Sequence, residues 1–247
     1  MRPPDPNRLG SRAEVGAPAR RGHSGRPLEA AKSQIPVDMS PAGGEPAVDS
    51  SEVLSAQHAR LLEGLAESIR EKGLGQTQVS DIVRHAKASR RTFYNHFDDK
   101  DACLVELEVI MSISAMEQVA AAIDAHARIE DQIDAGIDTY LEILRADLAL
   151  TVTFYSPALS ERVVRAQREG MERYAELLAS SVQAAAATDP LVVPVSLTQA
   201  FMLISGLAQT FGRAIELGDD LDDVATEIKQ VIKQIVRSSD PVRAGLQ

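Results

Sequence analysis

Apolar residues recur every three or four positions through most of the chain, which is the spacing of an amphipathic helix. Between Ser51 or Ser55 and Lys72 they are Leu61, Leu62, Leu65 and Ile69, and glycines 73 and 75 then end the helix. The same spacing predicts further helices over residues 79–86, 89–97, 100–123, 128–145, 147–155, 160–187, 197–218 and 221–237. No stretch alternates apolar and polar residues as a strand does, so the sequence predicts an all-α protein.

Two of these helices are short and lie on either side of a tight turn. The first, residues 79–86, places four apolar side chains on one face, and Thr77 or Ser80 can accept hydrogen bonds from the N–H groups at its start. Residues 86–88 are all that remains for the turn before Ser89, a favourable N-cap for the second helix. This arrangement predicts a helix-turn-helix.

The second short helix separates apolar from polar side chains. Phe93 and Phe97, four residues apart, point toward one side, while the polar residues between them point outward. No acidic residue occurs between residues 82 and 97, but four basic residues do: Arg84, Lys87, Arg90 and Arg91. A short turn followed by a basic helix is typical of a motif that enters the major groove of DNA.

The run SRRTFYNHFDDKDACL, preceded by VSDIVRHAKA, resembles the DNA-binding head of TetR-type transcriptional regulators. The most specific part is TFYNHF with Lys100 three residues later, and the similarity covers roughly residues 61–104. The resemblance implies a three-helix DNA-binding head over residues 51–98 and a helical ligand-binding and dimerisation body over residues 99–238. The family pattern usually has a glycine where this chain has Lys87, which leaves the geometry of the turn open.

The polar side chains of the head divide by what they can contact on DNA. Arg90 and Arg91 begin the second helix, from which an arginine can hold O6 and N7 of guanine with two hydrogen bonds, although a solvated helix face is the alternative. Donors suited to phosphate oxygens are carried by Thr77, Thr92, Tyr94, His96 and Lys100. The resemblance supports this role for Tyr94 and Lys100, whereas His96 has the alternative of packing beside Phe97. The predicted surface also includes Lys87, Ser89 and Asn95.

The whole chain carries a net charge of −10, which by itself disfavours nucleic acid as a partner. The excess of acidic residues lies beyond residue 100, however, while the basic residues of the head gather on its second and third helices. Salt screens charges beyond about 8 Å under physiological conditions, so a distant acidic body does not cancel a local basic patch. A double-stranded DNA operator therefore stays the expected partner.

Residues 1–50 are rich in Pro, Gly, Ala, Ser and Arg without helical spacing, and we expect them to form a disordered extension. Arg20, Arg21 and Arg26 allow a DNA-contacting arm, but the interspersed acids favour a solvated tail. A start at Met39 is a further alternative. Residues 239–247 are expected to be a flexible tail.

The expected compartment is the cytoplasm. Cys103 is the only cysteine, so an internal disulfide is excluded and a reducing environment is suitable. No apolar run free of charge approaches the roughly 18 residues that a membrane span needs. No apolar segment of a secretory signal is present either.

The last two helices predict an interface. The apolar stripe of residues 197–218 consists of Leu197, Phe201, Ile204, Leu207 or Ala208, Phe211 and Ile215, and that of residues 221–237 consists of Leu221, Val224, Ile228, Val231 and Ile235. In the resembled family the corresponding helices pair with their copies in a four-helix dimer interface. An internal bundle seam is the alternative, but two heads on a symmetric dimer fit two half-sites on DNA.

The resemblance also implies a small molecule that binds the body and releases a repressor from DNA. Candidate pocket residues are Met111, Met116, Tyr140, Phe154, Tyr155, Tyr174, Phe201 and Met202, with Thr151, Thr153 and Gln167 as possible polar anchors. These residue types do not identify the chemical class of the ligand, and we expect an apolar or amphipathic compound.

Catalysis is not expected. The chain has no glycine-rich phosphate loop, nucleophile elbow or Cys/His metal spacing, and we expect neither cofactor nor metal. The remaining alternative to a repressor is a helical interaction protein that has the same fold but binds no operator.

Overall fold

The computed structural model describes residues 50–237, and the prediction of an all-α fold is confirmed for this part of the chain. In order, the elements are α2 (Ser50–Lys72), the 3-10 helix η1 (Leu74–Gln76), α3 (Val79–Ala86), α4 (Arg90–His96), α5 (Lys100–Ala122), α6 (Ile129–Ala146), α7 (Leu148–Phe154), α8 (Glu161–Ala186), α9 (Leu197–Leu217) and α10 (Leu221–Val236). Ser50, expected at the end of a disordered extension, begins α2. The predictions for residues 1–49, including the basic arm and the start at Met39, and for the tail 239–247 lie outside the described residues.

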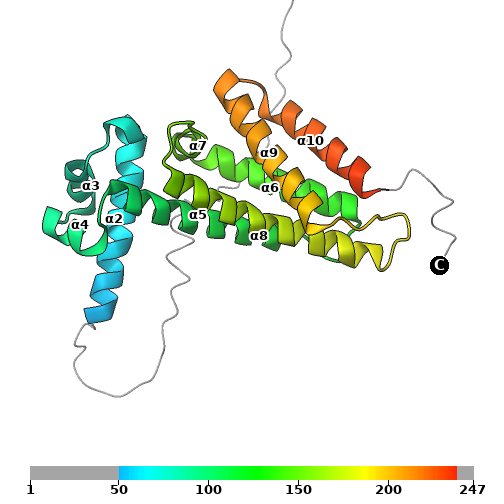
Figure 1. Ribbon diagram of the computed structural model, residues 1–247, viewed down its shortest axis with the longest axis horizontal. Helices are drawn as coiled ribbons and strands as arrows, with labels where there is room; N and C mark the ends of the chain where they lie inside the picture. Colours follow the sequence, from blue (N-terminus) through cyan, green and yellow to red (C-terminus); the bar gives the residue numbers. More distant parts are fainter. Residues whose placement is uncertain (1–49, 238–247) are drawn as a thin grey trace, which may run out of the picture.

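Helices α2, α3 and α4 form a head at one end of the molecule (Figure 1). Its core fully buries Leu61 and Leu65 of α2, Ile82 of α3 and Phe93 of α4. Gly64 allows α2 to pack directly on the backbone of α3, because a Cβ at this position would lie 2.5 Å from the carbonyl oxygen of Ile82. The orientation of the two short helices is therefore set by the long helix that precedes them.

Helix α5 leads from the head into the body (Figure 1). Its first turns bury Cys103, Leu104 and Leu107 in the core of the head, and its later turns bury Val119. Leu150 and Phe154 of α7 belong to the same hydrophobic cluster as the core of the head. Head and body are thus joined by continuous packing as well as by the chain.

Helices α5 to α10 form the body, in which α8 packs on both α5 and α9, and α10 packs on α6 and α9. A second hydrophobic cluster fills its far part and includes Ile133, Leu141, Val182 and Phe211. Helices α9 and α10 lie together as a pair on the outside of the body (Figure 1). This arrangement places the last two helices where their outer faces are accessible.

The end of α10 is tied to the start of α6. Arg237 pairs with Glu130, and its guanidinium also lies 3.3 Å from the carboxylate of Asp189. Arg237 further forms an isolated antiparallel bridge with Val192, whose neighbour Val193 donates its N–H to the carbonyl of Val236 at 2.8 Å. These contacts hold the end of α10 against α6 and the segment before α9.

Among the described helices, none combines the length and apolar character needed to cross a membrane.

Candidate DNA-binding surface and ligand cavity

The turn between α3 and α4 depends on a left-handed residue. Lys87 ends α3 with φ 51° and ψ 44°, and its N–H bonds to the carbonyl of Arg84 while the N–H of Ala88 bonds to the carbonyl of Val83. Lys87 is the one non-glycine residue with positive φ among those described. The turn therefore keeps the left-handed geometry that a glycine would adopt, and Lys87 adopts it at a steric cost of about 1–2 kcal/mol.

Ser89 then begins α4, as its residue type predicts. Its hydroxyl accepts from the N–H of Thr92 at 3.0 Å and lies 2.9 Å from the hydroxyl of Thr92. At the start of α3, by contrast, the N-cap is Gln78 and not Thr77 or Ser80, and the N–H of Gln78 donates to the carboxylate of Asp81 at 2.8 Å.

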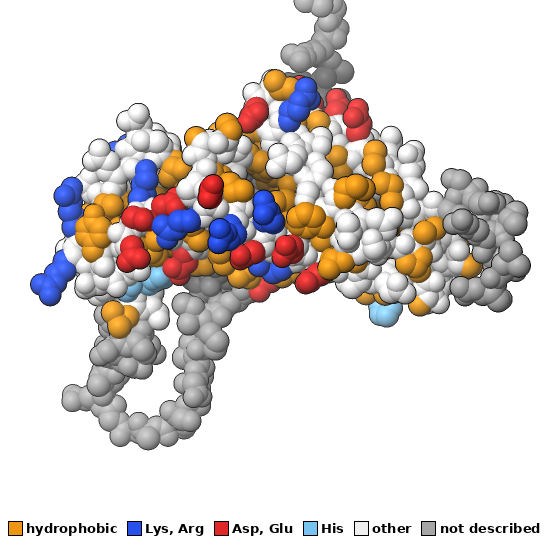
Figure 2. All heavy atoms as spheres, in the orientation of Figure 1, with side chains coloured by type: hydrophobic (Ala, Val, Ile, Leu, Met, Phe, Trp, Pro, Cys, Tyr) orange, Lys and Arg blue, Asp and Glu red, His pale blue; other side chains and the backbone are white. Residues whose placement is uncertain are grey.

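Helix α4 presents its polar residues to solvent. Phe93 is fully buried, whereas Arg90, Arg91 and Asn95 are exposed and Tyr94 is 57% exposed. Within the described part of the chain, neither arginine makes a hydrogen bond or an ion pair. Lys and Arg side chains project from this end of the molecule, over α3 and α4 (Figure 2). The arginines are therefore available to a ligand outside the chain.

The other basic residues of α3 are already occupied. Glu71 of α2 accepts from both Arg84, at 2.6 Å, and His85, at 2.7 Å. The bond from Arg84, followed by that from His85, holds the pKa of Glu71 below its ordinary value. This arrangement leaves Lys87, Arg90 and Arg91 as the positive charge of the surface.

Two residues expected to contact phosphate have their donors directed inward. Thr77 is buried, and its hydroxyl donates to the carbonyl of Gly73 at 2.8 Å. The ammonium of Lys100 donates to the carbonyls of Leu74 and Thr77, at 3.0 and 2.9 Å. Both residues therefore secure the loop that carries η1, and the sequence spacing held no sign of this long-range contact.

His96 packs in the head, which matches its alternative interpretation. Its ring lies 5.3 Å from that of His58 and 6.4 Å from that of Phe97, and its buried Nε2 has no partner. Desolvation lowers the pKa of His96, with a smaller contribution from His58. Because its ring is turned into the head, a phosphate contact is not favoured for this residue.

The body encloses a cavity of about 840 Å³ between α5, α6, α7, α8 and α9. Of the residues expected to line it, the structure places these at its wall: Met111, Tyr140, Thr151, Phe154, Tyr155, Gln167 and Tyr174. Ile133, Ile137, Ile204 and Leu207 add to a mostly apolar lining. A cavity of this size and character is suited to a small amphipathic molecule.

Three expected pocket residues, Met116, Phe201 and Met202, do not line the cavity, and neither does Thr153. On α5 the cavity face runs through Met111, Ala115 and Val119, so Met116 is turned away by one position. On α9, Met202 is 61% exposed on the outside, and Phe201 packs on the second hydrophobic cluster. The hydroxyl of Thr153 donates to the carbonyl of Ala149.

Several polar groups of the cavity are among the residues expected from the sequence, whereas Glu108 is not. The hydroxyls of Tyr140 and Tyr155 lie 2.7 Å apart, and the amide of Gln167 donates to the carbonyl of Phe154 at 2.6 Å. Glu108 of α5 also reaches the wall, where burial raises its pKa to about 7 against the opposing effect of Arg173. The signal in the sequence was a carboxylate between Leu107 and Val109, in a stretch of α5 rich in apolar residues.

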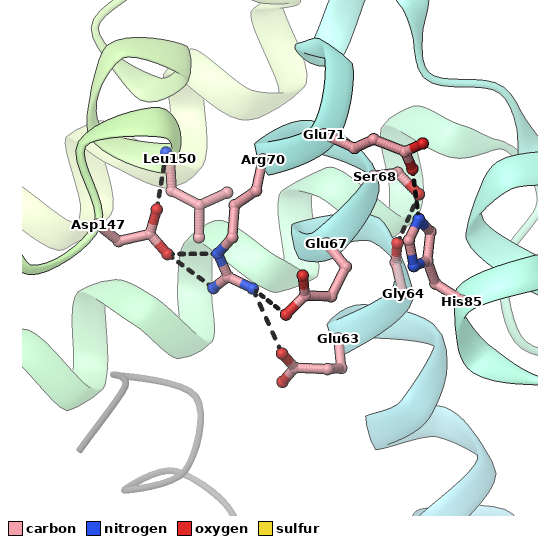
Figure 3. Close-up of polar contacts among 9 residues, drawn as sticks. All are labelled: Glu63, Gly64, Glu67, Ser68, Arg70, Glu71, His85, Asp147 and Leu150. Carbon is pink, nitrogen blue, oxygen red and sulfur yellow. Dashed lines mark hydrogen bonds and ion pairs between the residues drawn. The ribbon is translucent and has the colours of Figure 1, made fainter. Parts of the chain in front are cut away.

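An ion pair joins the cavity wall to the head. Arg70 of α2 donates through Nε to Asp147 at 2.7 Å, and its guanidinium also contacts Glu67 at 2.9 Å and Glu63 at 3.4 Å (Figure 3). Asp147 lines the cavity and caps α7 by accepting from the N–H of Leu150 at 3.3 Å. The two residues are 77 positions apart in the chain. One side of this contact thus belongs to the cavity wall and the other to the head.

The family model described as bacterial regulatory proteins, tetR family, matches residues 61–107, which span the helix-turn-helix and its supporting helices. Residues 61–107 therefore carry a DNA-binding domain of the tetR type.

The chain is similar to the uncharacterised HTH-type transcriptional regulator YvdT of Bacillus subtilis (strain 168), with 26% identity over 102 residues. That similarity covers 41% of this chain and 53% of YvdT, so it spans about half of the relative.

Solved structures with the same fold include the fatty acid degradation regulator FadR from Bacillus halodurans, at a TM-score of 0.58 and 17% identity, over 71% of this chain and 93% of that chain. The transcriptional regulator FadR from Bacillus subtilis in complex with stearoyl-CoA matches at a TM-score of 0.59 and 18% identity, over 70% and 95%. Reduced NemR from E. coli matches at 0.56 and 17%, over 74% and 98%. At these identities the likeness establishes that the chain shares their fold.

Proposed function

We propose that this TetR-family chain is a homodimeric, sequence-specific DNA-binding repressor that a small amphipathic ligand releases from its operator. The observation that carries the proposal is the pair Arg90 and Arg91, exposed at the first two positions of α4 with no ion pair to another described residue. Residues at the start of a recognition helix are the ones that reach base edges in the major groove.

The remaining exposed residues of the head support a phosphate-binding frame around these arginines. Lys87, Tyr94 and Asn95 are solvent-exposed and carry donors, and Thr92 is close beside Ser89 at the helix start. Contacts of this kind orient a protein on the duplex without distinguishing sequences. Thr77, His96 and Lys100 are proposed to support the surface from within.

Dimerisation is proposed through the outer faces of α9 and α10. Much of the apolar stripe predicted on α9 faces inward, because Phe211 is buried and Ile204 and Leu207 line the cavity. This part of the stripe behaves as the alternative, an internal bundle seam, requires. The outer face of α9 nevertheless exposes Met202 and Leu217. On α10, Val231 and Ile235 are exposed as well.

Glycine supports close approach at this outer face. Gly206 lies between Met202 and Leu217 on α9, and a Cβ placed on it would have no atom within 4 Å. Exposed apolar side chains around a small residue favour contact with a second copy. Light scattering should give a dimer for the chain and a monomer for Val231→Glu, while Val152→Glu, at an exposed position of α7, should stay dimeric. A dimer that survives the change at Val231 would contradict this interface.

Ligand control is proposed to act through α7. Phe154 and Thr151 of this helix line the cavity, and Leu150 and Phe154 also belong to the core cluster of the head. A ligand that changes the position of α7 would therefore shift both the shared core and the Arg70–Asp147 pair. FadR from Bacillus subtilis, which shares the fold, was solved with stearoyl-CoA, and this supports an amphipathic ligand in the present cavity.

Anisotropy measurements with labelled duplexes from the DNA flanking the gene of this chain test the proposal. Specific, salt-sensitive binding that resists unrelated competitor DNA is expected, and the double change Arg90→Ala and Arg91→Ala should abolish the preference. Arg168→Ala, at an exposed position of α8, is the matched control. Equal affinity for all duplexes, or none, would instead favour an interaction protein without an operator.

The proposed division into a DNA-binding head, residues 51–98, and a ligand-binding and dimerisation body, residues 99–238, places the boundary between α4 and α5. Because the proposed partner is operator DNA, the proposed location is the cytoplasm.

A further inference from the structure

The ligand cavity contains a carboxyl group that the chain itself does not neutralise. Glu108 lines the cavity from α5, and no hydrogen bond or ion pair joins it to another residue in the described part of the chain. Arg173 of α8 acts on it through space, but the guanidinium of Arg173 contacts the hydroxyl of Ser112 at 3.4 Å, and its buried Nε has no partner. A carboxylate in an apolar cavity without such partners is costly, and an incoming cation would relieve that cost.

Three tyrosines surround the same space. Tyr140 of α6, Tyr155 at the end of α7 and Tyr174 of α8 line the cavity. Burial raises the pKa of each, and the charge of Glu108 adds a smaller increase. The rings of Tyr140 and Tyr174 are 6.0 Å apart in an edge-to-face arrangement, and the buried hydroxyl of Tyr174 has no partner. Aromatic faces beside a carboxylate are the surroundings that an organic cation prefers.

The other charged residues of the lining do not suit an anion. Asp147 is engaged by Arg70, and Glu216 adds a further acid. Arg213 is the single basic residue of the lining within the described chain, and it is exposed at the end of α9. A carboxylate or phosphate headgroup would therefore enter a space in which acids outnumber bases.

We infer that the cavity binds a lipophilic cation, with an amine or quaternary ammonium group beside Glu108 and the tyrosines and an apolar tail along α5 and α6. The inference rests on the proposed ligand-responsive function and names the chemical class of its ligand. Glu108 supplies the charge, and the apolar wall that includes Ile133 and Ile137 accepts the tail.

Three probes with the same ten-carbon tail separate charge from hydrophobicity: decyltrimethylammonium, decanoate and decanol. Calorimetry on the full chain at pH 8 should give an affinity for the cation at least about tenfold above that for decanoate. Glu108→Gln should remove this preference and leave the affinity for decanol within about twofold. Glu117→Gln, on the same helix but outside the cavity lining, is the matched control and should retain it.

The affinity for the quaternary cation should also depend on pH. With a pKa of about 7, Glu108 is about one-tenth ionised at pH 6 and about nine-tenths ionised at pH 8, so affinity should rise roughly tenfold over this interval. Of the groups facing Glu108, Arg173 stays charged and Tyr140, Tyr155 and Tyr174 stay neutral throughout. The Glu108→Gln variant should show no such rise.

The outcomes distinguish the ligand class from the function itself. Tighter binding of decanoate, equal affinity for all three probes, or a cation preference that survives Glu108→Gln would overturn the cation assignment and leave a ligand-binding cavity. If none of the probes binds and none weakens binding to an established operator duplex, the cation assignment falls; the proposed repressor then stands on operator binding alone.

Discussion

The ion pair between Arg70 and Asp147 offers a quantitative test of how the head is attached to the body. The change Asp147→Asn removes the negative charge but keeps an oxygen that can cap α7, since Asn and Asp are equally good N-caps. The side chains of Arg70 and Asp147 are 16% and 10% exposed, so solvent screens the pair only in part. The change thus isolates the charge from the cap.

The expected cost follows from the geometry. Arg70 contacts Asp147 through two nitrogens, at 2.7 and 2.6 Å, and retains Glu67 at 2.9 Å after the change. A hydrogen bond to a charged group contributes about 1.5–3 kcal/mol, and we expect the free energy of unfolding to fall by about that amount. Desolvation is the largest single effect on the pKa of Arg70 and lowers it, but the hydrogen bond and charge of Asp147, with the charges of Glu67 and Glu63, together raise this pKa above its ordinary value.

Urea unfolding of four proteins measures the interaction directly: the chain itself, Asp147→Asn, Arg70→Gln and the double variant. The coupling energy from this cycle should be about 1–3 kcal/mol. Asp147→Ala should lose about 1 kcal/mol more than Asp147→Asn, because it also removes the cap on Leu150. A coupling energy near zero would show that the contact does not hold the head, and the proposed route from cavity to DNA through it would be refuted.

Three further changes test other parts of the molecule. Arg91→Ala should cost about 1–3 kcal/mol of discrimination at one operator base pair, measured by anisotropy across single-base variants of the operator. The control Arg168→Ala should leave this discrimination unchanged, and an equal loss of affinity on all variants would argue against a base contact by Arg91. Lys87→Gly should raise the free energy of unfolding by about 0.5–1 kcal/mol, because glycine adopts φ 51° without the steric cost, and a decrease in urea midpoint would contradict this. The hydrogen bond from Arg237 lowers the pKa of Glu130 to about 2, so the pair stabilises the fold above the ordinary carboxyl pKa and loses this effect as pH falls toward 2. Glu130→Gln should therefore lower the melting temperature at pH 6 but not at pH 2, and an equal loss at both values would exclude the ion pair as its cause.

Helix α7 belongs both to the wall of the cavity and to the core beneath the candidate DNA-binding surface. The proposed ligand control therefore depends on whether a ligand shifts this helix. Helix α7 contributes Leu150 to the core of the head and Thr151 to the wall of the cavity, one position later. Such a short helix cannot adjust one face without moving the other, since interiors are closely packed. In the proposed dimer, a ligand that favours one position of α7 would change the spacing of the two heads.

Local patterns determined the helices and the identity of the head. Apolar spacing every three or four residues, glycine at residue 73 and the cap at Ser89 act within one or two turns of the chain, so the sequence alone predicts them. Phe93 and Phe97 were assigned to the core for the same reason, and both are buried. The TFYNHF run carried the resemblance to a tetR-type head, and the family model matches this part of the chain, residues 61–107.

Tertiary structure alone decided which side chains meet across the fold. Arg70 and Asp147 are 77 residues apart, and Lys100 reaches the carbonyls of Leu74 and Thr77 over more than twenty positions. Likewise, Met116 and Met202 have the residue type of a pocket wall but lie outside it, while Glu108, an unexpected residue type, lies at the wall. Helical periodicity specifies that a residue faces one side of its helix, but only the packing of neighbouring helices decides whether that side meets a core, a cavity or solvent.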